Sequence, residues 1–393
     1  MCFNSKLVTS LIFLLYTQAS AQVPMCINGN IEGNDKLLKS YESSRDPLRV
    51  AFVNSRKINP TQTAKGDLCL PSDASKKNLS ALSSVSSHIQ SSGPKSPKIK
   101  RECIQAAMTR SPGNDGYICN YPTNKEAKRG FSNKTQSVPW AYGTAGGRSL
   151  QCVNNDMVDY VTFAVNNAIQ CMTPESLIDS RVIYKKLNNE TGFNSSLAAR
   201  GGVGIGQLTT PAIKELADEN LGKGRYILEN IAQSTKPECR AFKHIAEKDL
   251  QSRPRVQNTC DWVSPGDGLA RNLIYSVGYY LVMRDQYVIP ALSKRSPALT
   301  SNASLVSDFT AIAYGAEGLD HVKWLMQKHR VGKNTKATVL QGKIRKDSVY
   351  LTNIKGKMKE ITCIRKGKDP TSKECLDDKI SNADLEADSC VVK

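Results

Sequence analysis

The chain has 393 residues, with 54 Lys and Arg against 36 Asp and Glu, a formal net charge of +18, and 12 cysteines. An apolar content of 39% with 23% charged residues is enough to bury a core, which excludes a wholly disordered chain. The length suits one catalytic domain with appendages, or two to three modules. The positive charge favours a polyanionic partner, such as nucleic acid, anionic lipid or an anionic cell-wall polymer.

The N-terminus predicts export. Lys6 precedes an apolar stretch at 7–16 that is too short to span a bilayer as a helix, and Ala19-Ser20-Ala21 then supplies a small-residue cleavage pattern. We therefore expect a signal peptide over 1–21, cut after Ala21, rather than a buried core helix. No later segment is long and apolar enough for a membrane span. The mature chain is expected to be secreted or periplasmic, so nucleic acid is no longer an expected partner.

Removal of residues 1–21 leaves eleven cysteines, which in an oxidising compartment predict structural disulfides. There is no Cys-x-x-Cys pair and the four histidines form no close pair, so we expect neither a metal nor another cofactor. The sequence leaves the connectivity open, and an odd count leaves one thiol free or paired between chains. Neighbouring cysteines suggest three candidate bridges: Cys103/Cys119, Cys152/Cys171 and Cys239/Cys260.

The composition divides the mature chain into three parts. An N-terminal extension over 22–150 contains a flexible linker at 71–98, with ten serines and three prolines, followed by a loop-rich, disulfide-held segment at 101–148. Residues 151–335 are expected to be mostly helical, with apolar residues at helical spacing from position 156 and further patterns at 212–216, 269–289 and 305–313. One helix is predicted to begin at Thr173-Pro174 and to end near Glu190, before Gly192.

The C-terminal part, 336–393, is expected to be a small basic appendage. Between positions 328 and 368 there are 13 Lys and Arg and only two acids. Short runs at 337–340, 348–351 and 361–364 predict a β-rich module, tied down by Cys363, Cys375 and Cys390. The alternative is a solvated basic tail.

The residues with the clearest chemistry lie where the predicted helix ends at Glu190. A glycine-rich segment at 201–206 follows and carries Gln207, and its backbone can approach a ligand closely. A carboxylic acid enclosed by apolar groups such as Phe193 and Ile205 would have a raised pKa, as a general acid near neutral pH requires. The glycines fit neither a P-loop, since no Gly-Lys-Ser/Thr follows, nor a dinucleotide fingerprint. Without this setting, Glu190 would be an ordinary surface acid.

Four motifs resemble one known family. Glu190-Thr-Gly-Phe-Asn194 resembles the E-S-x-F-N signature of the soluble lytic transglycosylases, glycoside hydrolase family 23, which includes the goose-type lysozymes. The segment at 204–208, GIGQL, is similar to their G-L-M-Q motif. The stretch at 271–281 resembles in part their N-x-x-x-G-x-x-Y-L helix, and AYGAE at 313–317 stands where the family has A-Y-N-A-G. The motifs occur in the expected order over about 155–330.

The resemblance implies a mainly α fold with a lysozyme-like helical domain and cleavage of the β-1,4 bond between N-acetylmuramic acid and N-acetylglucosamine. Glu190 matches the catalytic acid, which would protonate the leaving oxygen and then act as a base. Gln207 and Tyr314 match positions that line the site, and Thr209 one that contacts the sugar; Ile205, Gly206 and Glu317 complete the candidate substrate-binding residues. Tyr314 could instead be a core aromatic. No second acid stands in the motif, as in substrate-assisted enzymes, although a fold could bring one near; the candidates are Asp218, Asp261 and Asp267.

The departures from the motifs bear on the substrate. Gly206 replaces the family's methionine, Ala198 or Ala199 its serine, and Gly315 and Glu317 the asparagine and last glycine of A-Y-N-A-G. Because an extra carboxylate at Glu317 could pair with a free amine, we expect a preference for a modified, N-deacetylated glycan.

These features predict an enzyme that opens peptidoglycan glycan strands, with the basic C-terminal segment binding anionic wall polymers. The alternative is a non-catalytic wall-binding protein on the same scaffold. A weaker third reading is an exported basic protein that binds nucleic acid or lipid through its C-terminal segment.

Overall fold

The computed structural model describes residues 95–110, 117–121, 134–138, 142–144, 151–153, 155–173, 177–194, 198–199, 201–220, 222–263, 267–366 and 388–392. The expected signal peptide and most of the expected linker lie outside these residues. The described part is mainly helical, as predicted, and its few strands form three antiparallel pairs. Among the described residues, no helix is long and apolar enough to cross a membrane.

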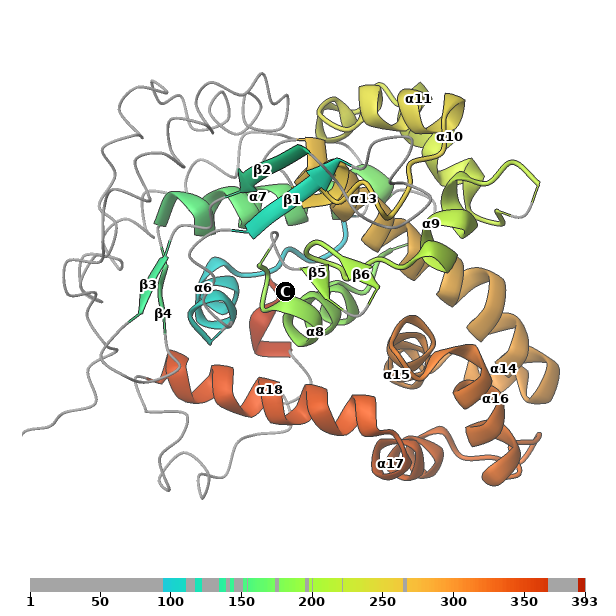
Figure 1. Cartoon of the computed structure of the whole chain (residues 1–393). Helices are drawn as coiled ribbons and strands as arrows, with labels where there is room; N and C mark the ends of the chain where they lie inside the picture. Colours follow the sequence, from blue (N-terminus) through green and yellow to red (C-terminus); the bar gives the residue numbers. More distant parts are fainter. Residues whose placement is uncertain are drawn as a thin grey trace, which may run out of the picture.

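Helix α7 (Asn155–Met172) confirms the helix expected from position 156 and packs against α13 (Asp267–Val282) at the centre of the fold (Figure 1). Its apolar residues recur every three or four positions and are fully buried: Val158, Val161, Val165, Ala168 and Ile169. This apolar stripe is what the sequence pattern indicated, because only one face of a helix can reach the core.

Helix α8 (Ser180–Thr191) begins later than predicted. The Thr173 hydroxyl donates to the Ile169 carbonyl oxygen at 2.8 Å, so Thr173 completes the end of α7 instead of capping α8. The cap is Asp179, whose carboxylate accepts from the Arg181 backbone amide at 3.0 Å. The predicted end is confirmed, because Gly192 lies in the left-handed region, with φ of 59°, and its amide bonds the carbonyls of the last turn.

The helical patterns predicted at 212–216, 269–289 and 305–313 are confirmed, and further helices lie between and after them. The helix expected at 269–289 is continuous but contains a π-helical turn, Met283–Val288, directly before α14 (Ile289–Arg295). Pro290 has no amide hydrogen to donate, which favours a local change of hydrogen-bond pattern in the turn before it. The other helices are α9 (Thr210–Ala217), α10 (Arg225–Gln233), α11 (Lys243–Gln251), α12 (Cys260–Val263), α15 (Ala303–Tyr314) and α16 (Gly318–Lys328).

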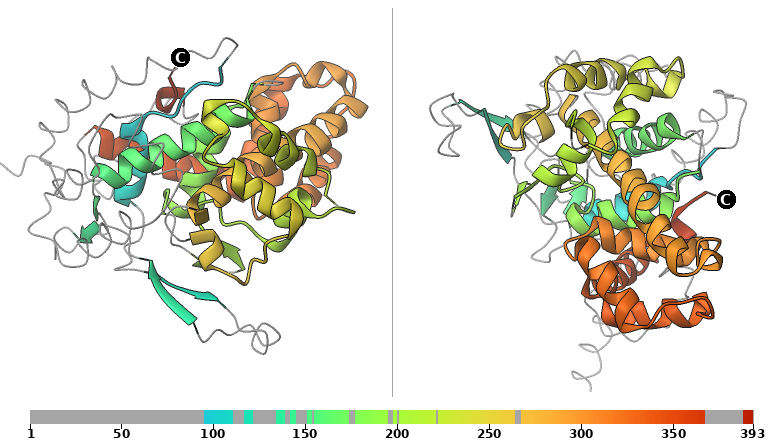
Figure 2. Two further views of the ribbon diagram at one scale, coloured as in Figure 1. Left: turned by 90° about the horizontal axis from the view of Figure 1, so that it is seen from above. Right: turned by 90° about the vertical axis from the view of Figure 1, so that its right-hand side faces the viewer.

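The expected β-rich character of the C-terminal segment is wrong. Residues 337–365 form two helices, α17 (Ala337–Asp347) and α18 (Val349–Arg365), and α18 packs against both α6 (Arg101–Arg110) and α8 (Figures 1 and 2). The run at 337–340 lies on α17, and the other two runs, at 348–351 and 361–364, belong to the buried face of α18. Apolar residues of that face recur every three or four positions, at Leu351, Ile354, Met358 and Ile361.

The N-terminal extension also differs from its expected loop-rich character. Helix α6 is largely buried and packs against α7 and α18, and the end of the expected linker is packed as well. Ser96 is buried; its hydroxyl lies 2.8 Å from Thr173 Oγ1 and accepts from the Ile178 amide at 2.7 Å. Strands β1 (Tyr117–Tyr121) and β2 (Lys134–Val138) form one hairpin-like pair, β3 (Tyr142–Thr144) and β4 (Gln151–Val153) another, and β5 (Ala198–Ala199) and β6 (Gly202–Val203) a third.

Two disulfides join segments that are far apart in the sequence. Cys103 on α6 bonds Cys390, 287 residues away, and Cys171 on α7 bonds Cys239, with Cα–Cα distances of 5.6 and 4.7 Å. All three predicted neighbour pairs are therefore wrong, because Cys103, Cys171 and Cys239 have other partners; Cys363 is disulfide-bonded too. The predicted use of cysteines in disulfides is confirmed and is compatible with an oxidising compartment.

Candidate functional site

Glu190 lies in the last turn of α8, at the point where the chain leaves the helix through Gly192 and Phe193, both with positive φ. Its side chain is 20% exposed, so solvent reaches it, and Oε1 accepts from Lys186 Nζ at 2.6 Å. The Tyr350 hydroxyl donates to the same oxygen at 3.5 Å. The nearest polar neighbours of this carboxylate are thus two residues that the sequence analysis did not single out.

Lys186 is buried, with a side chain that is only 6% exposed. It lies one helical turn before Glu190 on the same face of α8, and its ammonium stands 4.3 Å from the Tyr314 ring centroid and 5.8 Å from that of Tyr350. Burial lowers the pKa of Lys186, and the neighbouring Glu190 charge partly offsets that effect. The cation is therefore held between a carboxylate and two aromatic faces.

The two tyrosines come from distant elements, Tyr314 from the end of α15 and Tyr350 from the first turn of α18. Burial raises the pKa of both phenols, so each keeps its proton at neutral pH. Tyr314 lies beside Lys186 and packs edge-on to Tyr279, with ring centroids 5.0 Å apart. Lys186 therefore lies between Tyr314 and Glu190.

The glycine-rich segment is fastened to α8 and α13. The Thr191 hydroxyl donates to the Ile205 carbonyl oxygen at 2.9 Å. From α13, the Asn272 side chain accepts from the Gly206 amide at 2.9 Å and donates to the Val203 carbonyl at 2.8 Å. Asn272 thus holds the glycine-rich segment against α13.

Gly206 explains one departure from the motif. A Cβ atom at this position would lie 1.9 Å from the Ser276 Oγ of α13, so a methionine does not fit here unless the Ser276 side chain moves. Ile205 and Gly206, both expected to contact substrate, are buried. Instead of facing a ligand, they hold the segment in place: the Ile205 carbonyl oxygen bonds α8 and the Gly206 amide bonds α13.

Gln207 and Thr209 lie at the outer end of this segment. Gln207 is half-buried with φ of 45°, and its amide donates to the Gly204 carbonyl at 2.9 Å. Thr209 is exposed at the N-cap of α9 but makes no side-chain capping bond there.

Glu317 caps a helix. Its Oε1 accepts from the Val349 amide at 2.7 Å and the Tyr350 amide at 3.2 Å, while Oε2 accepts from the Ser348 hydroxyl at 2.5 Å. Both oxygens thus stabilise the first turn of α18. The expected preference for a deacetylated glycan depended on a Glu317 carboxylate that faces the sugar, and this carboxylate instead bonds α18.

Gly315 makes room for Tyr350. A Cβ atom at Gly315 would lie 2.7 Å from the Tyr350 ring, so an asparagine side chain at that position would displace the tyrosine. The two unusual residues of the 313–317 motif therefore have one physical cause, which is the docking of α18 beside α15.

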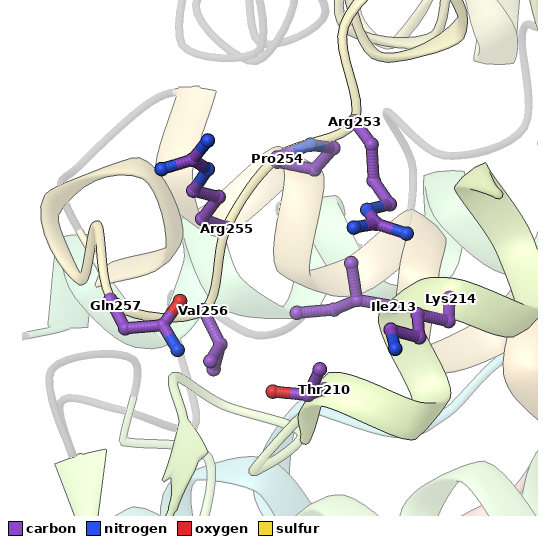
Figure 3. Close-up of a pocket in the computed structure, with 8 residues that line it drawn as sticks. All are labelled: Thr210, Ile213, Lys214, Arg253, Pro254, Arg255, Val256 and Gln257. Atoms are coloured by element: carbon purple, nitrogen blue, oxygen red, sulfur yellow. The ribbon is translucent and has the colours of Figure 1, made fainter. Parts of the chain in front are cut away.

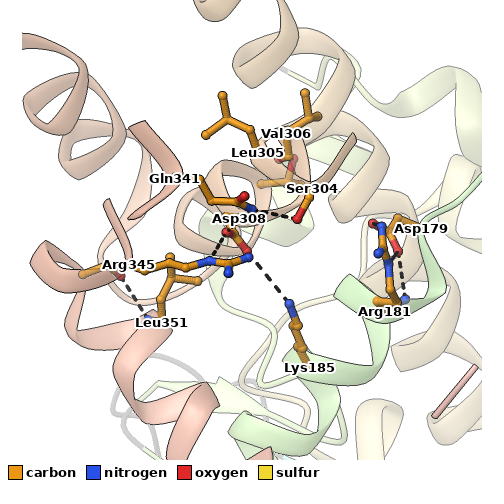
Figure 4. Close-up of polar contacts among 12 residues, drawn as sticks. Asp179, Arg181, Lys185, Ser304, Leu305, Val306, Asp308, Gln341, Arg345 and Leu351 are labelled. Atoms are coloured by element: carbon orange, nitrogen blue, oxygen red, sulfur yellow. Dashed lines mark hydrogen bonds and ion pairs between the residues drawn. The ribbon is translucent and has the colours of Figure 1, made fainter. Parts of the chain in front are cut away.

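A buried ionic cluster fixes α15 and α17 to α8 (Figure 4). Asp308 of α15 accepts from Arg345 Nε at 2.7 Å and Gln341 Nε2 at 2.9 Å, both on α17, and lies 3.9 Å from Lys185 Nζ of α8. The Lys185 and Asp308 side chains are almost fully buried. Consecutive lysines of α8 therefore point to two different carboxylates, Asp308 and Glu190.

A pocket of about 300 Å³ is lined by Thr210, the residue that follows Thr209 in the sequence (Figure 3). Its floor is apolar, with Ile213 of α9 facing Pro254 and Val256. Lys214 and Arg253 supply positive charge at its edge, and Arg253 also pairs with Asp218. The pocket therefore combines an apolar base with cations beside the segment expected to contact the sugar.

The three candidate second acids make contacts with residues other than Glu190. Asp218 pairs with Arg253, Asp267 pairs with His244 at 2.9 Å, and the Asp261 carbonyl accepts from Arg271. None of these contacts includes Glu190. Within the described part of the chain, no group of three or more His, Cys, Asp or Glu side chains is arranged to hold a metal ion.

Comparisons with known proteins identify no relative: no family model, no curated protein and no solved structure matches this chain. The functional argument therefore depends on the four motifs and on the geometry around Glu190. Of the two residues that the sequence analysis missed, Lys186 had a signal, since it stands four positions before Glu190 within one helix. Tyr350 had none, because its contact depends on the docking of α18.

Proposed function

We propose that this protein is an exported enzyme that cleaves peptidoglycan glycan strands at the β-1,4 bond between N-acetylmuramic acid and N-acetylglucosamine, with Glu190 as general acid and then base. One observation carries the proposal: a partly exposed carboxylate at the end of α8 stands beside a fastened glycine-rich segment, with Tyr314 and Tyr350 around its lysine partner. The four motifs in order supply the substrate class.

The arrangement supports chemistry with a single carboxylate. Glu190 would protonate the oxygen of the leaving N-acetylglucosamine as the glycosidic bond breaks, with the substrate's own N-acetyl group stabilising the positive charge at the anomeric carbon. The carboxylate would then accept a proton from the attacking hydroxyl. Attack by the 6-hydroxyl of the same muramyl residue gives an anhydro end, and attack by water gives a reducing end.

Digestion of purified sacculi tests the function directly. The full secreted chain should release soluble muropeptides, and mass spectrometry of their ends separates the transglycosylase from the hydrolase reaction. A protein that sediments with sacculi but releases nothing would support the alternative, a non-catalytic wall-binding protein.

Exposed lysines on and beside α17 and α18 favour an anionic wall partner. They are Lys336, Lys343, Lys346 and Lys355. Wall peptides and associated polymers carry carboxylates or phosphates, so these lysines would concentrate the enzyme on its substrate, with binding that weakens as salt rises.

The pocket beyond Thr209 predicts a contribution from the peptide branches of the substrate. Because Lys214 faces the apolar base, Lys214→Glu should raise KM for strands with carboxylate-bearing peptides by about threefold to tenfold, the range expected when an exposed charge contact is reversed. Release kinetics on intact strands and on strands stripped of peptides check this effect. Lys243→Glu on α11 changes the net charge equally and should leave KM unchanged; an equal rise on stripped strands would contradict a peptide contact.

A further inference from the structure

We propose that Lys186 is a second proton-carrying residue of the site. Between turnovers it holds the proton that Glu190 uses in catalysis, and it returns this proton to Glu190 before the glycosidic bond breaks. This inference rests on the proposed function for its catalytic meaning. The Lys186–Glu190 proton exchange itself is a property of the folded protein and can be measured without substrate.

The geometry places the proton donor and acceptor in direct contact. Lys186 Nζ lies 2.6 Å from Glu190 Oε1, which is a short, charge-assisted hydrogen-bond distance. The two residues share one face of one helix, so the pair is set by the backbone of α8. A proton can therefore move between these two atoms without any movement of the main chain.

The surroundings disfavour separated charges at Lys186. The groups that face it from the packed elements are Glu190 on its own helix, the Tyr314 ring and carbonyl oxygen from α15, and the Tyr350 ring from α18. Both phenols stay neutral, and the Tyr314 carbonyl at 3.5 Å supplies only a weak second acceptor. The Lys186 side chain is only 6% exposed, so burial costs desolvation energy on its ammonium, and a neutral amine hydrogen-bonded to a carboxylic acid avoids that cost. The lowered pKa of Lys186 agrees with this geometry.

The step balances in protons. The Lys186 ammonium gives one proton to the Glu190 carboxylate, which leaves a neutral amine and a carboxylic acid. The acid gives that proton to the leaving oxygen and becomes a carboxylate. It then takes a proton from the attacking hydroxyl, and Lys186 recovers it, so the pair ends each cycle as it began.

Lysine NMR tests the exchange without any cleavage assay. With ¹⁵N-labelled lysine, the Lys186 side-chain signal, assigned from its loss in Lys186→Arg, should titrate below the ordinary lysine pKa of about 10.4. In Glu190→Gln the offsetting carboxylate charge is gone, so the Lys186 titration should move further down. A Lys186 that titrates at the ordinary lysine pKa in both proteins would overturn the inference.

The pH dependence of muropeptide release separates proton storage from mere positioning. Lys186→Met removes the stored proton, so release at pH 7 should fall at least about tenfold and recover as the pH is lowered and solvent protonates Glu190. Lys186→Arg keeps a cation beside Glu190 but cannot give up its proton, so release should fall at least as far, with an optimum at still lower pH. Lys243→Met is the matched control.

Two results identify which idea fails. If Lys186→Arg retains most of the activity and neither optimum moves, Lys186 only positions Glu190 and the inference is wrong. If the native protein releases no muropeptides while the NMR shift is found, the proton exchange stands and the proposed function fails. Circular dichroism melting of each variant verifies that it is folded.

Discussion

Glu190→Gln is expected to lower muropeptide release from sacculi by about 10²–10⁴-fold, the usual contribution of a general acid. The amide has nearly the same size as the carboxylic acid but cannot give a proton to the leaving oxygen. Lys186 remains buried beside it and loses a charged partner, and it can respond by losing its own proton. The fold and wall binding should therefore persist while cleavage is lost.

The measurement compares release rates with cosedimentation on the same sacculi. Glu247→Gln, an identical change at an exposed position of α11, is the matched control and should cleave at the native rate. If Glu190→Gln released muropeptides undiminished, another group would be the acid and the assignment of this site would fail.

Asp249→Ala is expected to destabilise the protein by about 3–5 kcal/mol, the cost of leaving one member of a buried ion pair without its partner. The Asp249 and Arg271 side chains are 1% and 3% exposed, and two hydrogen bonds of 2.9 and 3.2 Å join them. After the change, the Arg271 guanidinium keeps the Asp261 carbonyl at 2.7 Å and the Trp262 ring but has lost its bonded carboxylate. Arg271 directly precedes Asn272, so the glycine-rich segment should loosen as well.

Urea unfolding measures this loss. Asp320→Ala removes an acid from an exposed pair with Lys323 and should change stability by less than about 0.5 kcal/mol, since surface ion pairs contribute little. A loss below about 1 kcal/mol in Asp249→Ala would contradict the assigned role of the buried pair.

Local features of the fold could be predicted from the sequence. The apolar stripe of α7 and the end of α8 at Gly192 depend on residues within one or two helical turns, and both were predicted correctly. The predicted start of α8 was wrong because Thr173 and Asp179 are both good N-cap residues. Only the bond from Thr173 to the end of α7 shows that Thr173 does not cap α8.

Features that depend on distant contacts could not be predicted. The β-like runs near position 350 are helical because their apolar residues meet α6 and α8, and the disulfide partners are set by packing across the fold. The candidate site shows the same division. The contact between Glu190 and Lys186 depends on positions within one helix, whereas Glu317 was predicted to face a sugar and instead caps α18, a helix that the sequence pattern did not reveal.

The docking of α18 has a consequence for when the site can exist. Glu190 and Lys186 precede Tyr350 by about 160 residues, and Cys103 precedes its disulfide partner Cys390 by 287. Until Tyr350 has been synthesised, the carboxylate lacks its tyrosine and the lysine lacks half of its aromatic surroundings. A chain that stops before α18 therefore carries an unfinished candidate site.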